Sequence, residues 1–331
     1  MSIYNVVLSG GVGSRLWPLS RLSEPKQYLP LFDGKSLFEL ALDRNRPLTD
    51  KVIVVGNERN RHLNEKKLTK ENRTCIEITE TVPRNTAAAI LFAAFEADDE
   101  DILLVTPSDH LIEQDEKYAY CVGKAVELAN KENALVLFGI HPTKPETGYG
   151  YIESSGYNVI SFREKPDSKT AKSFLERGNF LWNSGMFCFK AGVLKEEMIK
   201  HQPELFEKAF TAWNNRENGM LDHALCMEIP SISIDYAVME KSNHIKVIPA
   251  DFVWNDLGSF ESLYEYYRSK DYPVDTHGNM AIGNDRFTAF VGMKNTILVS
   301  TPTANLILQK ENSQEVKDLY SALENDHPEL I

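Results

Sequence analysis

The chain has 331 residues, of which 42% are hydrophobic and 25% are charged, and its formal net charge at pH 7 is −12. This length predicts one large α/β domain with a small second one, and the composition is typical of a globular protein in water. The acidic balance argues against a nucleic-acid partner, which would require a basic surface. It does not exclude a small phosphate-bearing ligand, because a few local lysines and arginines suffice to bind one.

The N-terminus and the cysteines predict a cytoplasmic protein. Residues 1–8 are typical of a first β-strand and lack the basic start and long apolar segment of a signal peptide. No stretch approaches the roughly 20 apolar residues that span a bilayer, so no membrane partner is expected. The four cysteines are scattered, which favours idle or buried thiols in a reducing compartment. The sequence leaves the oligomeric state open, a homodimer included.

The first half of the chain alternates between strands and helices. Four apolar runs end at turn residues, as strands buried on both faces do, and they cover residues 5–8, 52–55, 102–105 and 135–138. Helical stretches lie between them at 86–96 and 118–130. This order predicts a mostly parallel, Rossmann-like sheet flanked by helices. Ligands bind such sheets beyond the carboxyl ends of the strands, so the polar residues that follow each run are the first candidates.

The second half has shorter strands and more turns. We expect helices near 169–177, 193–201 and 259–269 in the same catalytic domain, which we predict to cover residues 1–270. A boundary at 271–275 precedes short β-like runs at 280–282, 288–291, 296–299 and 306–308 and a helix at 313–323. Residues 275–331 are therefore predicted to form a small β-rich C-terminal domain.

A glycine-rich turn follows the first strand. Three glycines within four positions allow a sharp turn whose backbone N–H groups can cradle an anion. The turn lacks the G-K-[ST] of a P-loop, and Arg15 and Leu16 stand where the dinucleotide fingerprint needs its last glycine. Alone, it could equally be a bare tight turn. Arg15 and the nearby Lys26 add two cations that suit a triphosphate, although either alone would be read as a solvated surface charge.

This segment resembles the signature of the sugar nucleotidyltransferases, G-G-x-G-[ST]-R-L-x-P-L followed by P-K. In that family the arginine and the lysine neutralise the phosphates of the nucleotide, and the resemblance implies these catalytic roles for Arg15 and Lys26. The amino-acid sequence around Trp17 and Gln27 most resembles that of the guanylyltransferase branch that handles mannose 1-phosphate. The resemblance also implies nucleotide-binding roles for Gly10, Gly11, Gly13 and Ser14.

Two aspartates occur at probable strand ends. Asp109 follows Thr106-Pro107-Ser108, and Asp256 precedes Leu257-Gly258-Ser259. A single strand-end aspartate is usually a turn or cap residue, but Mg²⁺ is commonly held by one or two carboxylates plus phosphate oxygens. Both segments resemble metal positions of the family, P-x-D-H and W-x-D-[VIL]-G-S. The resemblance implies that Asp109 and Asp256 bind Mg²⁺, that Asp109 also lies at the nucleotide, and that His110 is a packed neighbour.

Further segments resemble the parts of the family that read the base and the sugar. Asn85 lies in an R-N-T segment placed beside the base, although Asn85 or Thr86 could simply cap the helix that follows. The surrounding wording departs from the family, so no base contact is assigned to Thr81 or Val82. P-E-T-G-Y-G-Y-I, F-x-E-K-P and W-N-S-G-M-F resemble the sugar side, and Asp235 could cap a helix or approach the sugar. The sugar-phosphate-binding residues implied are Gly148, Glu164, Lys165 and Asn183.

The resemblance implies a reaction in which GMP passes from GTP to mannose 1-phosphate, with Mg²⁺ as the cofactor and GDP-mannose and pyrophosphate as products. No cupin-type isomerase domain follows, so no isomerase activity is expected. Three alternatives stay open: a nucleotidyltransferase for another base or hexose, a catalytically idle subunit that binds a nucleotide sugar, and a dehydrogenase. Arg15 within the glycine turn argues against the last.

Overall fold

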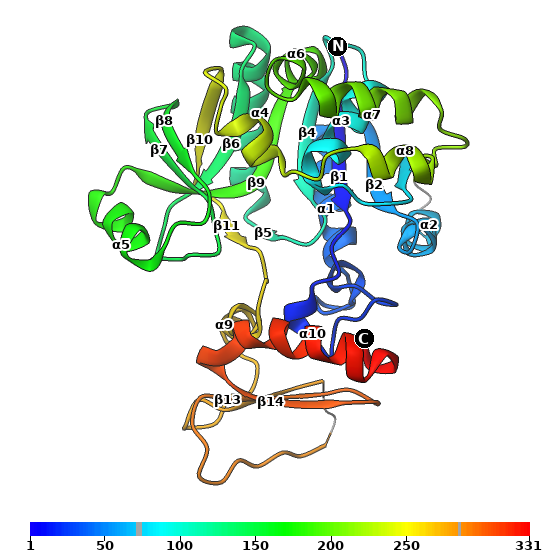
Figure 1. Ribbon diagram of the computed structural model, residues 1–331. Helices are drawn as coiled ribbons and strands as arrows, with labels where there is room; N and C mark the ends of the chain where they lie inside the picture. The colour runs from blue at the N-terminus through cyan, green and yellow to red at the C-terminus, as the bar shows by residue number, and fades with distance from the viewer. Residues whose placement is uncertain (71–74, 284–285) are drawn as a thin grey trace. The chain divides into compact units, whose positions relative to one another are not determined.

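The structure is a computed structural model, and it describes residues 1–70, 75–283 and 286–331 (Figure 1). The chain divides into two compact units. The first consists of Met1–Gly10, Ala41–Ser108 and Ile112–Trp254, and the second of Gly11–Leu40, Asp109–Leu111 and Asn255–Ile331. Residues 275–331, predicted as a separate domain, therefore share their unit with the glycine-rich segment.

The first unit is built on a nine-stranded sheet with the order β3-β2-β1-β4-β9-β6-β10-β8-β7. Strands β3, β2, β1 and β4 run parallel, as β6 and β10 do, whereas β9 runs antiparallel between β4 and β6. The α/β class is confirmed, and the sheet is mixed rather than parallel throughout. The strands span β1 Ile3–Ser9, β2 Lys51–Asn57, β3 Ile76–Glu80, β4 Ile102–Pro107, β6 Leu135–Ile140, β7 Tyr151–Ser155, β8 Asn158–Arg163, β9 Phe180–Lys190 and β10 Ile245–Ala250.

Helices cover both faces of this sheet, which explains its continuous apolar runs. In β4, Leu103 and Val105 join one apolar cluster with α3, α6 and α7, while Ile102 and Leu104 join a second cluster with α4. Neighbouring residues of β4 thus point into different cores, so residues 102–105 are all apolar. The helices are α1 Leu37–Asn45, α2 Arg61–Lys70, α3 Asn85–Glu96, α4 Asp115–Glu132, α5 Ser168–Arg177, α6 Ala191–His201, α7 Pro203–Asn214 and α8 His223–Glu228, with a π-helix, η4, at Asp235–Met239 and a short 3-10 helix, η3, at Arg46–Leu48.

The second unit draws on both ends of the chain. Its apolar core combines Leu16 and Trp17 with Val299, Val316 and Tyr320. A three-stranded sheet pairs β12 in parallel and β14 in antiparallel fashion with β13. The elements are η1 Ser14–Leu16, η2 Lys26–Tyr28, α9 Phe260–Ser269, β12 Met280–Ile282, β13 Thr296–Ser300, β14 Asn305–Gln309, η5 Lys310–Glu315, α10 Val316–Asp326 and η6 Pro328–Leu330, and the short strands β5 Leu111–Glu113 and β11 Val253–Asn255 lie where the chain passes between the units.

Two predicted elements near the C-terminus differ from the structure. The run at 288–291 is not a strand, because Val291 is 90% exposed and the next residue, Gly292, turns the chain at φ 74°. The helix predicted from residue 313 begins as the 3-10 helix η5 and becomes α-helical only at Val316. Within the described ranges, no helix is long and apolar enough to cross a membrane.

Candidate functional site

The glycine-rich turn is shaped by glycines at two kinds of position. Gly13 has φ 77°, and a Cβ there would lie 2.6 Å from the Cβ of Lys26, so both the backbone and the approach of Lys26 require glycine. A Cβ on Gly10 or Gly11 would meet nothing within 4 Å. The turn is therefore tight where it meets Lys26 and open at its first two glycines, and Ser14 begins the 3-10 helix η1 directly after it.

Internal donors hold the carbonyl groups of this turn within the second unit. Gln27 Nε2 donates to the Gly11 carbonyl at 2.9 Å, and Ser20 Oγ donates to the Gly13 carbonyl at 2.6 Å. The Lys26 backbone N–H donates to the Val12 carbonyl at 3.1 Å. Outward carbonyl oxygens would repel an anion, so their capture by internal donors suits a phosphate-binding turn.

Lys26 is the centre of the charged cluster in the second unit. Its side chain is only 5% exposed, and Nζ lies 2.8 Å from Asp109 Oδ2. The same Nζ donates to the backbone carbonyl of Asp256 at 2.6 Å. Removal from water would raise the pKa of Asp109, but the charges of Lys26 and His110 outweigh that effect and the pKa is lowered. One buried ammonium thus joins both predicted aspartate segments and keeps Asp109 ionised.

The Asp256 segment folds back on itself. The Gly258 N–H donates to Asp256 Oδ1 at 3.1 Å, and a Cβ on Gly258 would lie 2.5 Å from Asp256 Oδ2. Glycine is therefore required for this close approach to the carboxylate. His110 is 14% exposed and its Nε2 lies 3.8 Å from Asp109 Oδ1, so it packs beside the aspartate.

Asp109 and Asp256 are the candidate carboxylates for a metal ion. No group of three or more His, Cys, Asp or Glu side chains that could hold an ion occurs within residues 1–70, 75–283 and 286–331. Asp109 and Asp256 offer hard oxygen atoms near one lysine, and Mg²⁺ is usually held by one or two carboxylates together with substrate phosphates and water. The residues present therefore fit a metal that completes its coordination with substrate oxygens.

Asn85, the predicted base-binding residue, lies in the first unit at the start of α3. It is exposed and has φ 70°, and its Oδ1 accepts from the N–H of Thr86 at 2.8 Å. The cap position belongs to Arg84, which makes no side-chain capping bond, and Thr86 Oγ1 accepts from the Ile234 N–H. Thr86 is therefore not the cap of α3, whereas the Asn85 side chain satisfies one backbone N–H of the first turn of α3, as a capping residue does.

The first unit contains a polar cluster of its own, which includes three of the predicted sugar-phosphate residues. Glu164 Oε1 lies 2.8 Å from Lys165 Nζ, and the Glu164 side chain is 7% exposed. The other oxygen, Oε2, is buried without a hydrogen-bond partner among the described residues. Burial would lower the pKa of Lys165, but Glu164 more than offsets this and the pKa is raised. The cluster therefore offers a charged ammonium and an unsatisfied acceptor.

Asn183 and Asp235 complete this cluster. Asn183 Nδ2 donates to Asp235 Oδ1 at 2.9 Å, while Asn183 Oδ1 accepts from the Gly185 N–H at 3.2 Å. Burial, followed by the nearby Glu164 carboxylate, raises the pKa of Asp235 to about 6. Of the two roles predicted for Asp235, its contact with Asn183 supports the approach to the sugar residues.

Two glycines of the P-E-T-G-Y-G segment differ in their surroundings. Gly148, which the sequence singles out, is exposed and donates its N–H to Glu146 Oε1 at 3.1 Å. Gly150 was not singled out from the sequence, but it has no room for a side chain, since a Cβ there would lie 2.4 Å from Glu164 Oε2. Gly150 is part of the P-E-T-G-Y-G motif, so the sequence contained a signal for it. Its contact with Glu164, fourteen positions later, is visible only in three dimensions.

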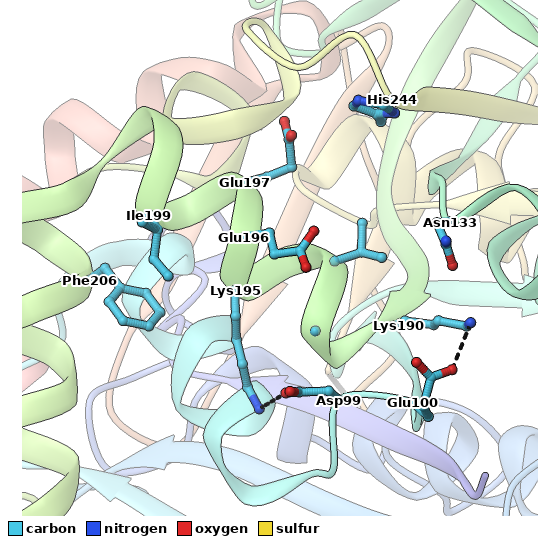
Figure 2. Close-up of a pocket in the computed structure, with 12 residues that line it drawn as sticks. Asp99, Glu100, Asn133, Lys190, Lys195, Glu196, Glu197, Ile199, Phe206 and His244 are labelled. Carbon is cyan, nitrogen blue, oxygen red and sulfur yellow. Dashed lines mark hydrogen bonds and ion pairs between the residues drawn. The ribbon is translucent and has the colours of Figure 1, made fainter.

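A cavity elsewhere in the first unit contains none of the predicted site residues. It has a volume of about 630 Å³, and Figure 2 shows lysines and carboxylates side by side in it. Lys190 pairs with Glu100 and Lys195 with Asp99, each at 2.8 Å. These charges are already paired with one another, so the cavity does not rival the two clusters as the functional site.

Comparison with known proteins first defines the class of the protein. Residues 4–271 match the family model described as nucleotidyl transferase, and residues 272–323 match the MannoseP isomerase/GMP-like beta-helix domain. The first match covers the segments of both polar clusters. Nucleotidyl transferases of this kind generally use a divalent metal.

Relatives with known names narrow the class. The chain is 39% identical to the xanthan biosynthesis protein XanB of Xanthomonas campestris, over 97% of this chain and 73% of that protein. It is 36% identical to mannose-1-phosphate guanylyltransferase of Klebsiella pneumoniae, over 94% of this chain and 72% of that protein. A crystal structure from Thermus thermophilus, described as mannose-1-phosphate geranyltransferase, has a TM-score of 0.85 and 30% identity over 98% of this chain and 100% of its own. The chain belongs to the nucleotidyl transferase family, among the sugar-1-phosphate nucleotidyltransferases.

Proposed function

We propose that this enzyme transfers GMP from GTP to mannose 1-phosphate and releases GDP-mannose and pyrophosphate. The observation that carries the proposal is the buried Lys26 ammonium, which joins the Asp109 carboxylate to the Asp256 segment beside the glycine-rich turn. The base and the sugar follow from the relatives named mannose-1-phosphate guanylyltransferase in Klebsiella pneumoniae and Escherichia coli. The geometry supports the chemistry, and the names support the choice of substrates.

The second unit is assigned to the triphosphate. The backbone of Gly11–Ser14, continuing from Gly10, would cradle the phosphates, and Lys26 and Arg15 would compensate the charge that gathers on the α-phosphate and the leaving pyrophosphate. Asp109 and Asp256 would hold a divalent metal, proposed as Mg²⁺, which when bound supplies further charge neutralisation at the phosphate oxygens.

The first unit is assigned to the sugar and the base. Glu164 Oε2 is buried without a donor among the described residues, a costly state that a hexose hydroxyl would relieve. Asn183 and Gly148 would contact further sugar oxygens, and the ammonium of Lys165 would bind the monoester phosphate. The exposed carboxamide of Asn85 would contact the nucleotide base.

The reaction proposed is an in-line displacement at phosphorus. A phosphate oxygen of mannose 1-phosphate forms a bond to the α-phosphorus of GTP, and the bond from that phosphorus to the bridging oxygen of the β-phosphate breaks. The attacking oxygen is already an anion at neutral pH, so no general base is needed. The residues of the chain then act by positioning the two anions and by compensating their charge.

The decisive experiment measures pyrophosphate release with each of four nucleoside triphosphates and several hexose 1-phosphates. We expect the highest kcat/KM for GTP with mannose 1-phosphate. A tenfold or greater preference for UTP or dTTP, about 1.4 kcal/mol, would overturn the guanylyl assignment. Absence of turnover with every pair would instead favour the idle-subunit alternative.

Lys165→Ala tests which cluster binds the sugar phosphate. Because Lys165 would hold a phosphate that is charged before the reaction, its loss should raise the KM for mannose 1-phosphate more than that for GTP. Lys131→Ala is the matched control, since Lys131 is 69% exposed and pairs with Glu127 on the surface of α4. A selective loss of GTP binding in Lys165→Ala would show that the substrates are assigned to the wrong clusters.

A further inference from the structure

The C-terminal segment holds the side chains of the glycine-rich segment from a great distance along the chain. Arg15 Nη1 donates to Gln314 Oε1 at 3.0 Å, across 299 positions. Trp17 Nε1 donates to the Leu330 carbonyl at 2.8 Å, and Arg21 Nη2 donates to Thr303 Oγ1. Three side chains within seven residues are therefore held by residues that follow position 300, all within the second unit.

Apolar packing fixes the backbone beneath Arg15. The 3-10 helix η1 contacts both α10 and η5. Leu16 and Trp17 are 1% and 5% exposed, and they share an apolar cluster with Val316, Tyr320 and Leu323. A three-residue 3-10 helix has little stability of its own, so its geometry depends on this support. Gln314 lies in η5, next to the residues that provide it.

We propose that Gln314 is a positioning residue for Arg15, which it holds in the orientation used on the nucleotide phosphates. This inference rests on the proposed function, because it takes Arg15 to meet the nucleotide. A guanidinium has five N–H donors, and one bond to a neutral amide oxygen leaves its charge uncompensated and its other donors available. A carboxylate at the same place would orient Arg15 but would also compensate its charge. The neutral amide supplies the orientation alone.

Two substitutions at Gln314 separate orientation from charge. Gln314→Met keeps the length of the side chain and removes the acceptor, and Gln314→Glu keeps an acceptor and adds a negative charge. Lys317→Gln changes the net charge by the same amount on the exposed surface of α10 and serves as the control. Steady-state kinetics with each substrate varied and the thermal midpoint are measured for every variant.

We expect Gln314→Met to lower kcat about threefold to tenfold, the effect of one lost hydrogen bond, with the KM for mannose 1-phosphate unchanged. Gln314→Glu should lower kcat further, and Lys317→Gln should leave it unchanged. All three variants should keep the thermal midpoint, because Gln314 is exposed. Wild-type kinetics in both Gln314 variants would overturn the proposal, as would a loss that merely tracks the thermal midpoint.

A double-mutant cycle with Arg15→Ala shows whether Gln314 acts through Arg15. If it does, Gln314→Met should cost nothing further in the Arg15→Ala background. An equal loss in both backgrounds would overturn the inference and leave the proposed function standing. If Arg15→Ala alone leaves kcat/KM unchanged, the assignment of Arg15 to the nucleotide fails, and this inference fails with it.

Discussion

Asp235 shows how a single buried carboxyl group links the sugar cluster to the stability of the fold. Burial and Glu164 raise its pKa from 3.8 to about 6. Below pH 3.8 the group is neutral in the folded and unfolded states, so it carries no penalty. As the pH rises to about 6, the unfolded chain ionises first and the folded state becomes less stable. Above about pH 6 the loss is complete, on the order of 3 kcal/mol.

Asp235→Asn should therefore stabilise the protein at pH 7 by up to about 3 kcal/mol, with the gain vanishing near pH 4. The amide oxygen can still accept from Asn183, so the hydrogen bond is kept. Thermal midpoints of both proteins from pH 4 to 8 give the difference. Asp167→Asn is the contrasting control, because hydrogen bonding to Thr170 lowers the pKa of Asp167. The ionised Asp167 therefore stabilises the fold at neutral pH, and this stabilisation is lost in acid. A pH-independent difference for Asp235→Asn would contradict the argument.

Residues within short motifs could be predicted from the sequence, and residues defined by distant contacts could not. The sequence motifs around Lys26, Asp109 and Asp256 predicted one site. In the structure, the Lys26 ammonium contacts the Asp109 carboxylate and the backbone carbonyl of Asp256. Their individual roles remain predictions. Gln314 carries no signal, because a glutamine in a polar segment is ordinary and its partner Arg15 lies 299 positions away.

At the level of elements, the buried strands were the easiest to predict. Runs covered by helices on both faces are continuously apolar over four or more positions, and β2, β4 and β6 follow this pattern, whereas β1 carries the buried Asn5 among its apolar residues. The antiparallel insertion of β9 was not predicted, because the polar Asn183 and Ser184 interrupt its apolar sequence. Ser184 is nevertheless buried, where its hydroxyl donates to the Phe138 carbonyl at 2.7 Å. A side-chain bond to a neighbouring strand leaves no periodic pattern in the sequence.

Gly13 provides a test of the glycine-rich turn as an element. Gly13→Ala would place a Cβ 2.6 Å from Lys26 Cβ at a residue with φ 77°. Gly34→Ala is a matched control, because Gly34 has φ 79° and a Cβ there would meet nothing within 4 Å. Both variants should lose about 1 kcal/mol of stability from backbone strain. Only Gly13→Ala should also displace Lys26 and lower kcat, by on the order of tenfold or more.

Denaturant unfolding and steady-state kinetics of the two glycine variants supply the comparison. Equal activity in both would mean that Lys26 accommodates the added methyl group without moving away from Asp109. A loss of activity in Gly34→Ala as well would mean that general strain, rather than the contact with Lys26, controls the turn.

For the whole molecule, the order of the sequence conceals how the core of the second unit is assembled. Residues 11–40 belong to the segment that carries the nucleotide signature, yet Leu16 and Trp17 pack with Val316 and Tyr320. The sequence predicts a boundary near residues 271–275, where the two family matches also meet. Linear patterns report local periodicity, so they could not reveal that the two ends of the chain share one core.

Cutting the chain at this boundary tests whether the preceding residues can function alone. A fragment of residues 1–271 would lack Val316, Tyr320 and Leu323 and would expose Leu16 and Trp17, at about 1.5–3 kcal/mol for each large side chain. We expect it to unfold at a lower temperature than the full chain, with red-shifted tryptophan fluorescence and little nucleotidyl transfer. A chain ending at His327 should lose much less, because it keeps Val316, Tyr320 and Leu323 and lacks η6, the partly buried Leu330 and Ile331, and the bond from Trp17 to the Leu330 carbonyl. Full activity and an unchanged melting temperature in the 1–271 fragment would show instead that the glycine-rich turn holds its shape without the C-terminal helix.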